Sequence, residues 1–177
     1  KDGTPEISIL HHMMSAIAHR GPDGSGQIVK DKVILGHTRL SIIDLKTGDQ
    51  PISNTRGDQI IANGEIYNFV ELRDRLGTDN FSTLADCEAP LILFQSKGKK
   101  FAEDMRGMYA ITIVEGDSGE IYLSRDRFGI KPLYICEDEK GLSFASEIGA
   151  LMEANIVKPV LNTTVRDQLL QQQFSLG

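Results

Sequence analysis

Three short segments contain residue types that could bind and hydrolyse a small polar substrate. Arg39 lies between two apolar segments, and a guanidinium at a strand end can bind a carboxylate through two parallel hydrogen bonds. Asn63-Gly64 offers a side-chain amide and a backbone N–H that could form an oxyanion hole, and Asp86 could bind a ligand's ammonium group. Taken singly, each also has an ordinary structural explanation: a salt bridge, a tight turn and a helix N-cap.

Other reactive residues are weaker candidates. Cys87 could be a nucleophile at a helix start, but the flanking carboxylates of Asp86 and Glu88 oppose thiolate formation. Cys136 falls in a predicted strand and is assigned to the core. None of the four histidines has zinc-site spacing, so no metal site is expected. Residues 24–26 (GSG) lack a phosphate-loop context and predict a turn that brings the backbone close to another segment.

Composition excludes several classes of function. The 177 residues carry a net charge of −6, which argues against nucleic-acid binding because phosphates require a basic surface. Hydrophobic residues make up 40% and charged residues 25%, as in ordinary globular domains. Apolar stretches are too short to cross a membrane, and two cysteines cannot form a disulfide scaffold. Without a signal-peptide pattern, a cytoplasmic location is expected.

Hydrophobic periodicity predicts the elements that position these residues. Thr4 and Pro5 begin a first helix that ends near residue 18, and Asn68, with Glu71 as capping-box partner, begins a second that ends at Gly77. Further helices are predicted at 86–96, 101–105, 146–153 and 162–173. Strands are predicted at 27–30, 33–37, 41–45, 59–62, 109–115, 120–125, 133–137 and 142–145. Hairpin-rich strands with segregated helices indicate an α+β fold with largely antiparallel sheets.

Several segments together carry a family resemblance. Residues 19–26 (HRGPDGSG), 36–44 (GHTRLSIID) and 63–68 (NGEIYN) resemble the class II glutamine amidotransferase domain, most of all the N-terminal half of glutamine-hydrolysing asparagine synthetases. Residues 85–88, 106–110, 125–134 and 144–148 continue the resemblance in the same order. It therefore covers nearly the whole chain.

The resemblance implies an N-terminal-nucleophile hydrolase fold, in which two mostly antiparallel sheets form a four-layer αββα arrangement. It also implies that glutamine is hydrolysed to glutamate and that the ammonia passes to a separate synthetase site. In this family an N-terminal cysteine thiolate attacks the side-chain amide, and its own α-amine is the base. An α-amine has an unperturbed pKa of about 7.7 to 8.0, which suits proton transfer near neutral pH.

The matching positions imply residue roles. Arg39 matches the arginine that pairs with the glutamine α-carboxylate, and Asn63 with Gly64 matches the oxyanion hole. Glu65 and Asp86 match the anchors of the α-amino group. The backbone that lines the family's pocket matches Leu40, Ser41, Ile42 and Ile43, whereas residues 125–134 are given a structural role.

Two departures from the family pattern affect this interpretation. The sequence begins at Lys1, beyond the family's cysteine and its short strand, and Ala85 replaces the usual serine. We expect residues 1–156 to be the glutaminase domain without that first strand, and residues 157–177 to lead toward an absent synthetase domain. That domain would bind ATP, Mg²⁺ and aspartate, since no pyrophosphate loop occurs here, and the glutaminase domain itself needs no cofactor.

Two alternatives and one question of assembly stay open. The chain could be a non-catalytic glutaminase-like module, as in β-lactam synthetase-like proteins, or part of a polysaccharide-associated relative of asparagine synthetase. The retained Arg39, Asn63-Gly64 and Asp86 favour a catalytic domain, because a non-catalytic module needs no oxyanion hole. A homodimer is a possible assembly.

Overall fold

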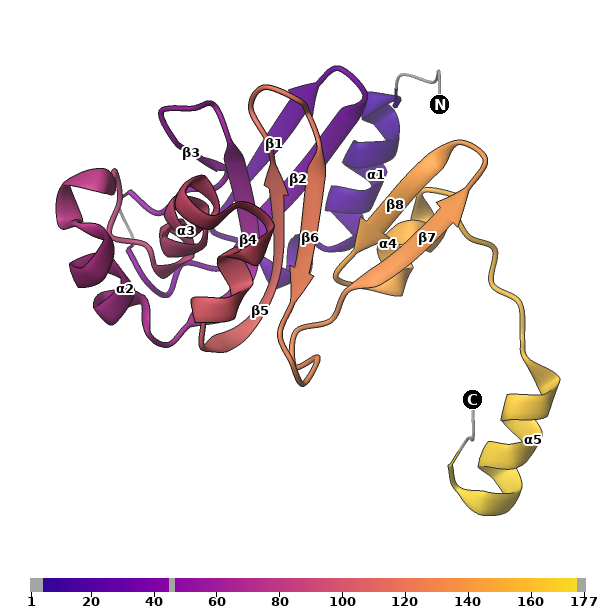
Figure 1. The fold of residues 1–177 in the computed structure, drawn as a ribbon. Coiled ribbons are helices and arrows are strands. Elements are labelled where there is room, and N and C mark those ends of the chain that lie inside the picture. Colours follow the sequence, from indigo (N-terminus) through magenta and orange to yellow (C-terminus); the bar gives the residue numbers. More distant parts are fainter. Residues whose placement is uncertain (1–4, 45–46, 175–177) are drawn as a thin grey trace.

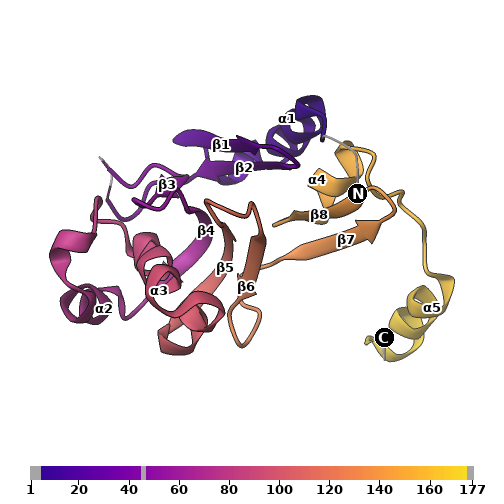
Figure 2. The ribbon, with the colours of Figure 1, turned by 45° about the horizontal axis from the view of Figure 1, so that its top comes forward.

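Four layers make up the protein, as seen in a computed structural model that describes residues 5–44 and 47–174 (Figures 1 and 2). Helices α1 (Ile7–Ala16) and α4 (Ile148–Glu153) form one outer layer. Two β-hairpins lie beneath them, followed by a four-stranded sheet and then by helices α2 (Phe69–Leu76) and α3 (Ala89–Lys97). The arrangement agrees with the predicted αββα order.

The central sheet is antiparallel throughout. It contains β3 (Ile52–Ser53), β4 (Gln59–Ile66), β5 (Gly107–Val114) and β6 (Ile121–Arg125), in that order. Its largest hydrophobic cluster joins β4 and β5 to α2 and α3, through fully buried residues that include Ile60, Leu72, Leu91, Leu93, Ile111 and Ile113. Because these residues of β4 are buried against the helices, the burial also determines which face of β4 turns away from the helices.

Two separate hairpins make up the second β-layer in the described part of the chain. β1 (Gly24–Lys30) pairs with β2 (Val33–Arg39), and β7 (Tyr134–Asp138) pairs with β8 (Gly141–Ala145). The first hairpin packs on the central sheet through Ile28, Leu35, Ile61 and Val114. The second packs on α4 and α1, and its Phe144 also packs against the cluster of the first hairpin, but over the described residues the two hairpins do not hydrogen-bond to one another.

Short 3-10 helices connect the longer elements. They are η1 (Ala18–Arg20), η2 (Thr78–Asn80), η3 (Asp86–Glu88) and η4 (Gly98–Asp104). Helix α5 (Thr163–Gln172) stands apart from the layers at the end of an extended segment, and none of its residues is buried (Figures 1 and 2).

Most predicted elements are confirmed, including both C-terminal hairpins and Gly77 at the end of α2; of Asn162 and Thr163, the two residues that could cap α5, Asn162 is the N-cap. The predicted strand at 41–45 is wrong over its described residues, which form an irregular loop. Helix α1 begins at Ile7 rather than at Pro5, and Thr4 lies outside the described residues.

Asn68 occupies the predicted N-cap position of α2, but neither Asn68 nor Asp86 makes the predicted side-chain cap, because both side chains bind distant backbone groups. The Asn68 amide donates to the Asp104 carbonyl and accepts from the Arg106 N–H, while Glu71 pairs with Arg106. Helix α3 begins at Ala89, so Asp86 precedes its cap position.

Residues 24–26 form the start of β1 rather than a turn, but the predicted close backbone approach is confirmed. A Cβ atom on Gly26 would lie 1.9 Å from the Gln50 carbonyl oxygen, whereas one on Gly24 would have its nearest neighbour at 3.9 Å. Gly26 therefore allows the loop before β3 to lie directly against β1.

We expect Gly26→Ala to lower the free energy of unfolding by about 1–3 kcal/mol or more, because the backbone of two segments must separate. Gly24→Ala in the same strand is the matched control and should change it by less than about 0.5 kcal/mol. Urea denaturation measures both. Equal effects of the two substitutions would contradict the close approach.

Candidate functional site

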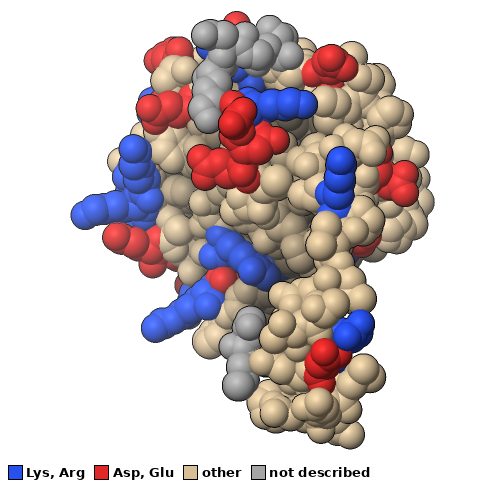
Figure 3. All heavy atoms as spheres, turned by 90° about the vertical axis from the view of Figure 1, so that its right-hand side faces the viewer, with Lys and Arg blue, Asp and Glu red and all other residues tan. Residues whose placement is uncertain are grey.

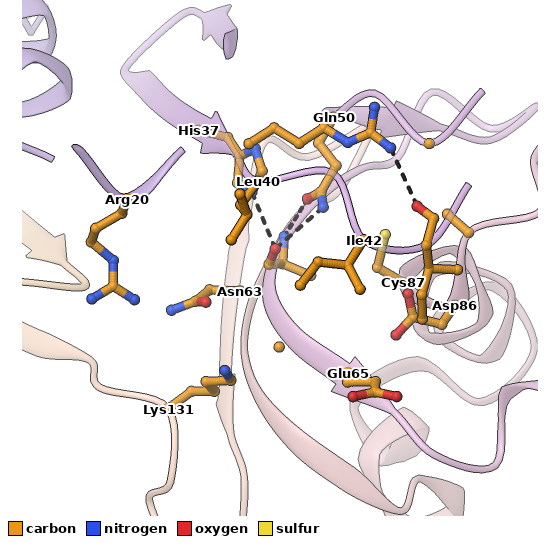
Figure 4. A pocket seen from close by; sticks show the side chains of 16 residues that line it. Arg20, His37, Leu40, Ile42, Gln50, Asn63, Glu65, Asp86, Cys87 and Lys131 are labelled. Atoms are coloured by element: carbon orange, nitrogen blue, oxygen red, sulfur yellow. Dashed lines mark hydrogen bonds between the residues drawn. The ribbon is translucent and has the colours of Figure 1, made fainter. Parts of the chain in front are cut away.

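A cleft of about 240 Å³ opens between β2, β4 and the start of η3 (Figure 4). Eight of the nine predicted site residues line it: Arg39, Leu40, Ile42, Ile43, Asn63, Gly64, Glu65 and Asp86. Ser41 does not line it; its backbone N–H donates to the Asp23 carboxylate at 2.8 Å.

Strand periodicity places the polar side chains of β4 in this cleft. Ile61 packs against the hairpin layer, and side chains two residues apart share a face of a strand. Asn63 and Glu65 therefore face the hairpin layer, and Figure 4 shows both beside the cavity. The Asn-Gly pair lies inside the strand, so the alternative of an Asn-Gly turn is wrong.

The edge of β4 that faces away from β5 exposes backbone groups of alternate residues. At Ala62, the N–H donates to Gln50 Oε1 at 2.6 Å, and the carbonyl accepts from Gln50 Nε2 and His37 Nε2. At Ile66, the N–H donates to Asp86 Oδ2 at 2.7 Å. Gly64 lies midway between these positions, so its N–H is directed to the same edge and into the cleft.

The partner strand supports this orientation of Gly64. Gly64 lies opposite Tyr109, whose backbone N–H and carbonyl both pair with Asp126 on the other side of β5. The two residues are therefore not a hydrogen-bonded pair of the ladder. Gly64 has a φ of 150°, and a Cβ atom there would lie 2.0 Å from the Met108 carbonyl oxygen. A glycine is required at this point of the strand.

Two buried nitrogen atoms at the cleft have no hydrogen-bond partner: Asn63 Nδ2 and His37 Nδ1. His37 Nε2 contacts a carbonyl oxygen, which can only accept, so Nε2 carries the hydrogen and Nδ1 is an acceptor. Burial lowers the pKa of His37, which keeps the ring neutral. Asn63 thus offers an unused donor beside Gly64, and buried donors without partners are rare in proteins.

Arg39 is almost completely buried and is bound within its own loop. Its Nη1 lies 2.5 Å from Asp49 Oδ1, and its Nη2 donates to the Ile43 and Asp44 carbonyls. The cation is therefore fixed at one end of the cleft.

Carboxylates gather on another side of the cleft. Burial raises the pKa of Asp86, and the nearby charge of Glu65 raises it further, while the Ile66 N–H opposes the shift. A cation bound between these two carboxylates would lower the pKa of Asp86 and so offset the effects of burial and of the Glu65 charge. The cleft therefore offers carboxylates that can bind a cation and a guanidinium that can bind an anion.

Sequence reasoning missed several lining residues, among them Arg20, His37, Gln50 and Lys131. Lys131 belongs to the segment that was given a purely structural role, and its backbone is held by Asp126 and Arg125. Figure 4 shows Arg20 and Lys131 on the same side of Asn63. Arg20, His37 and Lys131 lie within the quoted motifs, but the sequence gives no sign that they meet at one cleft, because they belong to η1, β2 and the segment after β6.

Cys87 lines the cleft but cannot supply a nucleophile. Burial, with the charge of Asp86 next in importance, raises the pKa of its thiol to about 12. The rejection of this cysteine from the sequence agrees with that environment. Among the described residues, no group of three or more His, Cys, Asp or Glu side chains could hold a metal ion.

Comparison with known families settles the classification. Residues 1–176 match the family described as "Glutamine amidotransferase domain". The chain belongs to this family. The resemblance found in the sequence is confirmed.

Curated relatives of this amidotransferase domain are longer proteins. The chain is 44% identical over 144 residues to asparagine synthetase [glutamine-hydrolyzing] 2 of Bacillus subtilis, covering 81% of the chain and 19% of the relative. It is also 44% identical over 137 residues to asparagine synthetase B [glutamine-hydrolyzing] of Escherichia coli, covering 76% and 25%. The amidotransferase domain thus spans a quarter or less of these relatives.

A solved structure confirms the fold class. The chain superposes on glutamine phosphoribosylpyrophosphate amidotransferase from B. subtilis with a TM-score of 0.73 and 23% identity. The match covers 86% of this chain and 42% of that one. The predicted α+β fold of the N-terminal-nucleophile hydrolase type is therefore correct.

We expect iodoacetamide at pH 8 to modify Cys87 at least ~100-fold more slowly than the partly exposed Cys136, because only the thiolate reacts and each pKa unit removes tenfold of it. Peptide mass spectrometry over time gives both rates. The rates should become similar in urea. Rapid modification of Cys87 in the folded protein would contradict the buried, neutral thiol.

Proposed function

We propose that this domain hydrolyses glutamine to glutamate and ammonia. The observation that carries the proposal is the pair of donors on β4: the unpartnered Asn63 amide and the Gly64 N–H at the strand edge. Two fixed donors in a cleft can stabilise the oxyanion of a tetrahedral intermediate, each contributing about 3–4 kcal/mol.

The charges around these donors suit a zwitterionic amino acid. Arg39 would bind the α-carboxylate, and Glu65 with Asp86 would bind the α-ammonium group. Backbone of the loop at Leu40, Ser41, Ile42 and Ile43 would line the substrate. A glutamine held by both charged groups of its α-carbon would extend its side-chain amide toward the remaining wall of the cleft, where Asn63 lies.

The nucleophile in this proposal is an N-terminal cysteine supplied by a segment before Lys1. Its thiolate adds to the amide carbon, and the oxygen becomes an oxyanion held by Asn63 and Gly64. Protonation of the nitrogen by the cysteine's α-ammonium releases ammonia and leaves a thioester, which water then hydrolyses to glutamate. Cys87 cannot take this role, since its pKa is about 12.

The ammonia would serve a synthetase domain in the same protein. Relatives that share this domain are named asparagine synthetases, so ATP-dependent amidation of aspartate, with Mg²⁺, is the proposed use in the cytoplasm. Residues 1–156 would form the glutaminase domain and 157–177 the connection. The connection exposes Val160, Leu161 and Leu170, and the surrounding face carries mixed charges and large uncharged areas (Figure 3). Within the described residues no helix is long and apolar enough to cross a membrane.

The direct test is glutamate release from glutamine by the full-length protein, together with sequencing of its N-terminus. Glutamine hydrolysis with cysteine as first residue supports the proposal. A protein without that cysteine and without hydrolysis would be a non-catalytic module.

Asn63→Ala should lower kcat for glutamine hydrolysis by about 10²–10³ with little change in KM, because the amide contacts the substrate oxygen most strongly in the transition state. Steady-state glutamate release measures this. Asn80→Ala, which alters an exposed asparagine of η2, is the control and should leave kcat unchanged. An unchanged kcat in Asn63→Ala would refute the oxyanion role.

Arg39→Ala and Asp86→Asn should each raise KM for glutamine by about 10- to 100-fold, because a charge-assisted hydrogen bond to substrate contributes about 1.5–3 kcal/mol. Asp86→Asn keeps an oxygen that can accept from the Ile66 N–H, so its thermal midpoint should stay near that of the wild type. The same kinetic assay applies. Wild-type KM values in both folded variants would contradict the proposed zwitterion site.

A further inference from the structure

We propose that Asp49 sets the affinity of the cleft by competing with the substrate's α-carboxylate for Arg39. The inference rests on the proposed function, in which Arg39 binds that carboxylate. Asp49 would act as an internal carboxylate ligand that glutamine must displace. It is a specificity-determining residue that the sequence comparison does not identify.

Both terminal nitrogens of the Arg39 guanidinium already have hydrogen-bond partners. Nη1 lies 2.5 Å from Asp49 Oδ1, and both carbonyl contacts, from Ile43 and Asp44, go to Nη2. Each terminal nitrogen has two hydrogens, so the two carbonyls account for both hydrogens of Nη2. Of the two terminal nitrogens, only Nη1 can therefore take up a substrate carboxylate without displacing a carbonyl, and Asp49 already binds Nη1.

The two partners differ strongly in exposure. The Arg39 side chain is 9% exposed, whereas the Asp49 side chain is 82% exposed. The cation is thus fixed in the cleft wall, while its carboxylate partner reaches it from the solvent side. An exposed carboxylate regains its hydration when it leaves, so the pair is weak enough for a ligand to break.

The backbone around Asp49 is held independently of this ion pair. The side-chain amide of Gln50 is hydrogen-bonded to the N–H and the carbonyl of Ala62. The Gly48 N–H donates to the Asp44 carbonyl at 3.3 Å. The Asp44 carboxylate accepts in turn from the Leu84 N–H at 2.8 Å. Release of Arg39 consequently requires only rotation of the Asp49 side chain, not unfolding of the loop.

This arrangement predicts an effect limited to ligands that carry an α-carboxylate. If the Arg39–Asp49 pair is formed in 70–90% of molecules, the apparent affinity for such a ligand is reduced by about 3- to 10-fold. A glutamine analogue whose α-carboxylate is replaced by an amide leaves the pair intact and meets no such competition. Other charged groups of the cleft, Arg20, Lys131, Glu65 and Asp86, are the same for both ligands.

The test uses Asp49→Ala and Asp49→Asn in the full-length protein, with Asp117→Asn as control. Asp117 is an exposed carboxylate in the turn between β5 and β6, away from the cleft. We expect Asp49→Ala to lower KM for glutamine about 3- to 10-fold with kcat unchanged, and Asp49→Asn to act in the same direction. The inhibition constant of the α-amide analogue should not change, and Asp117→Asn should match the wild type.

A second measurement does not depend on glutamine as substrate. Phenylglyoxal modifies free guanidinium groups, and peptide mass spectrometry gives its rate at Arg39. Asp49→Ala should raise that rate several-fold, whereas Asp117→Asn should not. If the wild type and all variants fail to hydrolyse glutamine, the proposed function fails, and the phenylglyoxal rates still decide whether Asp49 masks Arg39.

Two results would overturn the inference. One is an unchanged or higher KM for glutamine in folded Asp49→Ala, and the other is an equal phenylglyoxal rate at Arg39 with and without the Asp49 carboxylate. A decrease in KM that extends equally to the α-amide analogue would also overturn it, because competition for Arg39 cannot affect that ligand.

Discussion

The unpaired edge of β4 is the constraint on which the cleft depends. A strand edge inside a folded domain presents N–H and carbonyl groups that need partners, and leaving them buried and unpaired is unfavourable. Beyond the short β3, side chains complete the edge: Gln50 at Ala62 and Asp86 at Ile66. Between them Gly64 keeps its N–H directed at the cleft. The hydrogen bonds that pair the backbone groups of this strand edge thus also hold the walls of the site in place.

The positions of Gln50 and Asp86 follow from this requirement. The Gln50 amide fixes the end of the loop that begins at Arg39, and Gly26 lets that loop lie against β1. Asp86 connects η3 to the end of β4 and places Cys87 and Ala85 on the cleft wall. Loop, strand and helix start are therefore coupled through backbone hydrogen bonds rather than through apolar packing alone.

Charge is separated within the cleft although the chain as a whole is acidic. The net charge is −6, yet the guanidinium of Arg39 is buried beside two backbone carbonyls and one carboxylate. The carboxylates of Glu65 and Asp86 lie close enough to raise the pKa of Asp86. Charges of both signs around one small cleft suit a small zwitterion, and the carboxylate already on Arg39 shows the type of group that this cation binds.

The sequence by itself determined the local elements. Apolar periodicity and turn residues located α2, α3 and both C-terminal hairpins, and the ordered motifs identified the amidotransferase family and half of the cleft residues. Tertiary structure decided where Asn68, Asp86 and Asn63 direct their side chains, and it brought Lys131 to the cleft and Asp49 to Arg39. The physical reason is that Asn and Asp make the same hydrogen bonds to a local helix end or to a distant strand edge. Only the packed chain determines which of those backbone groups is within reach.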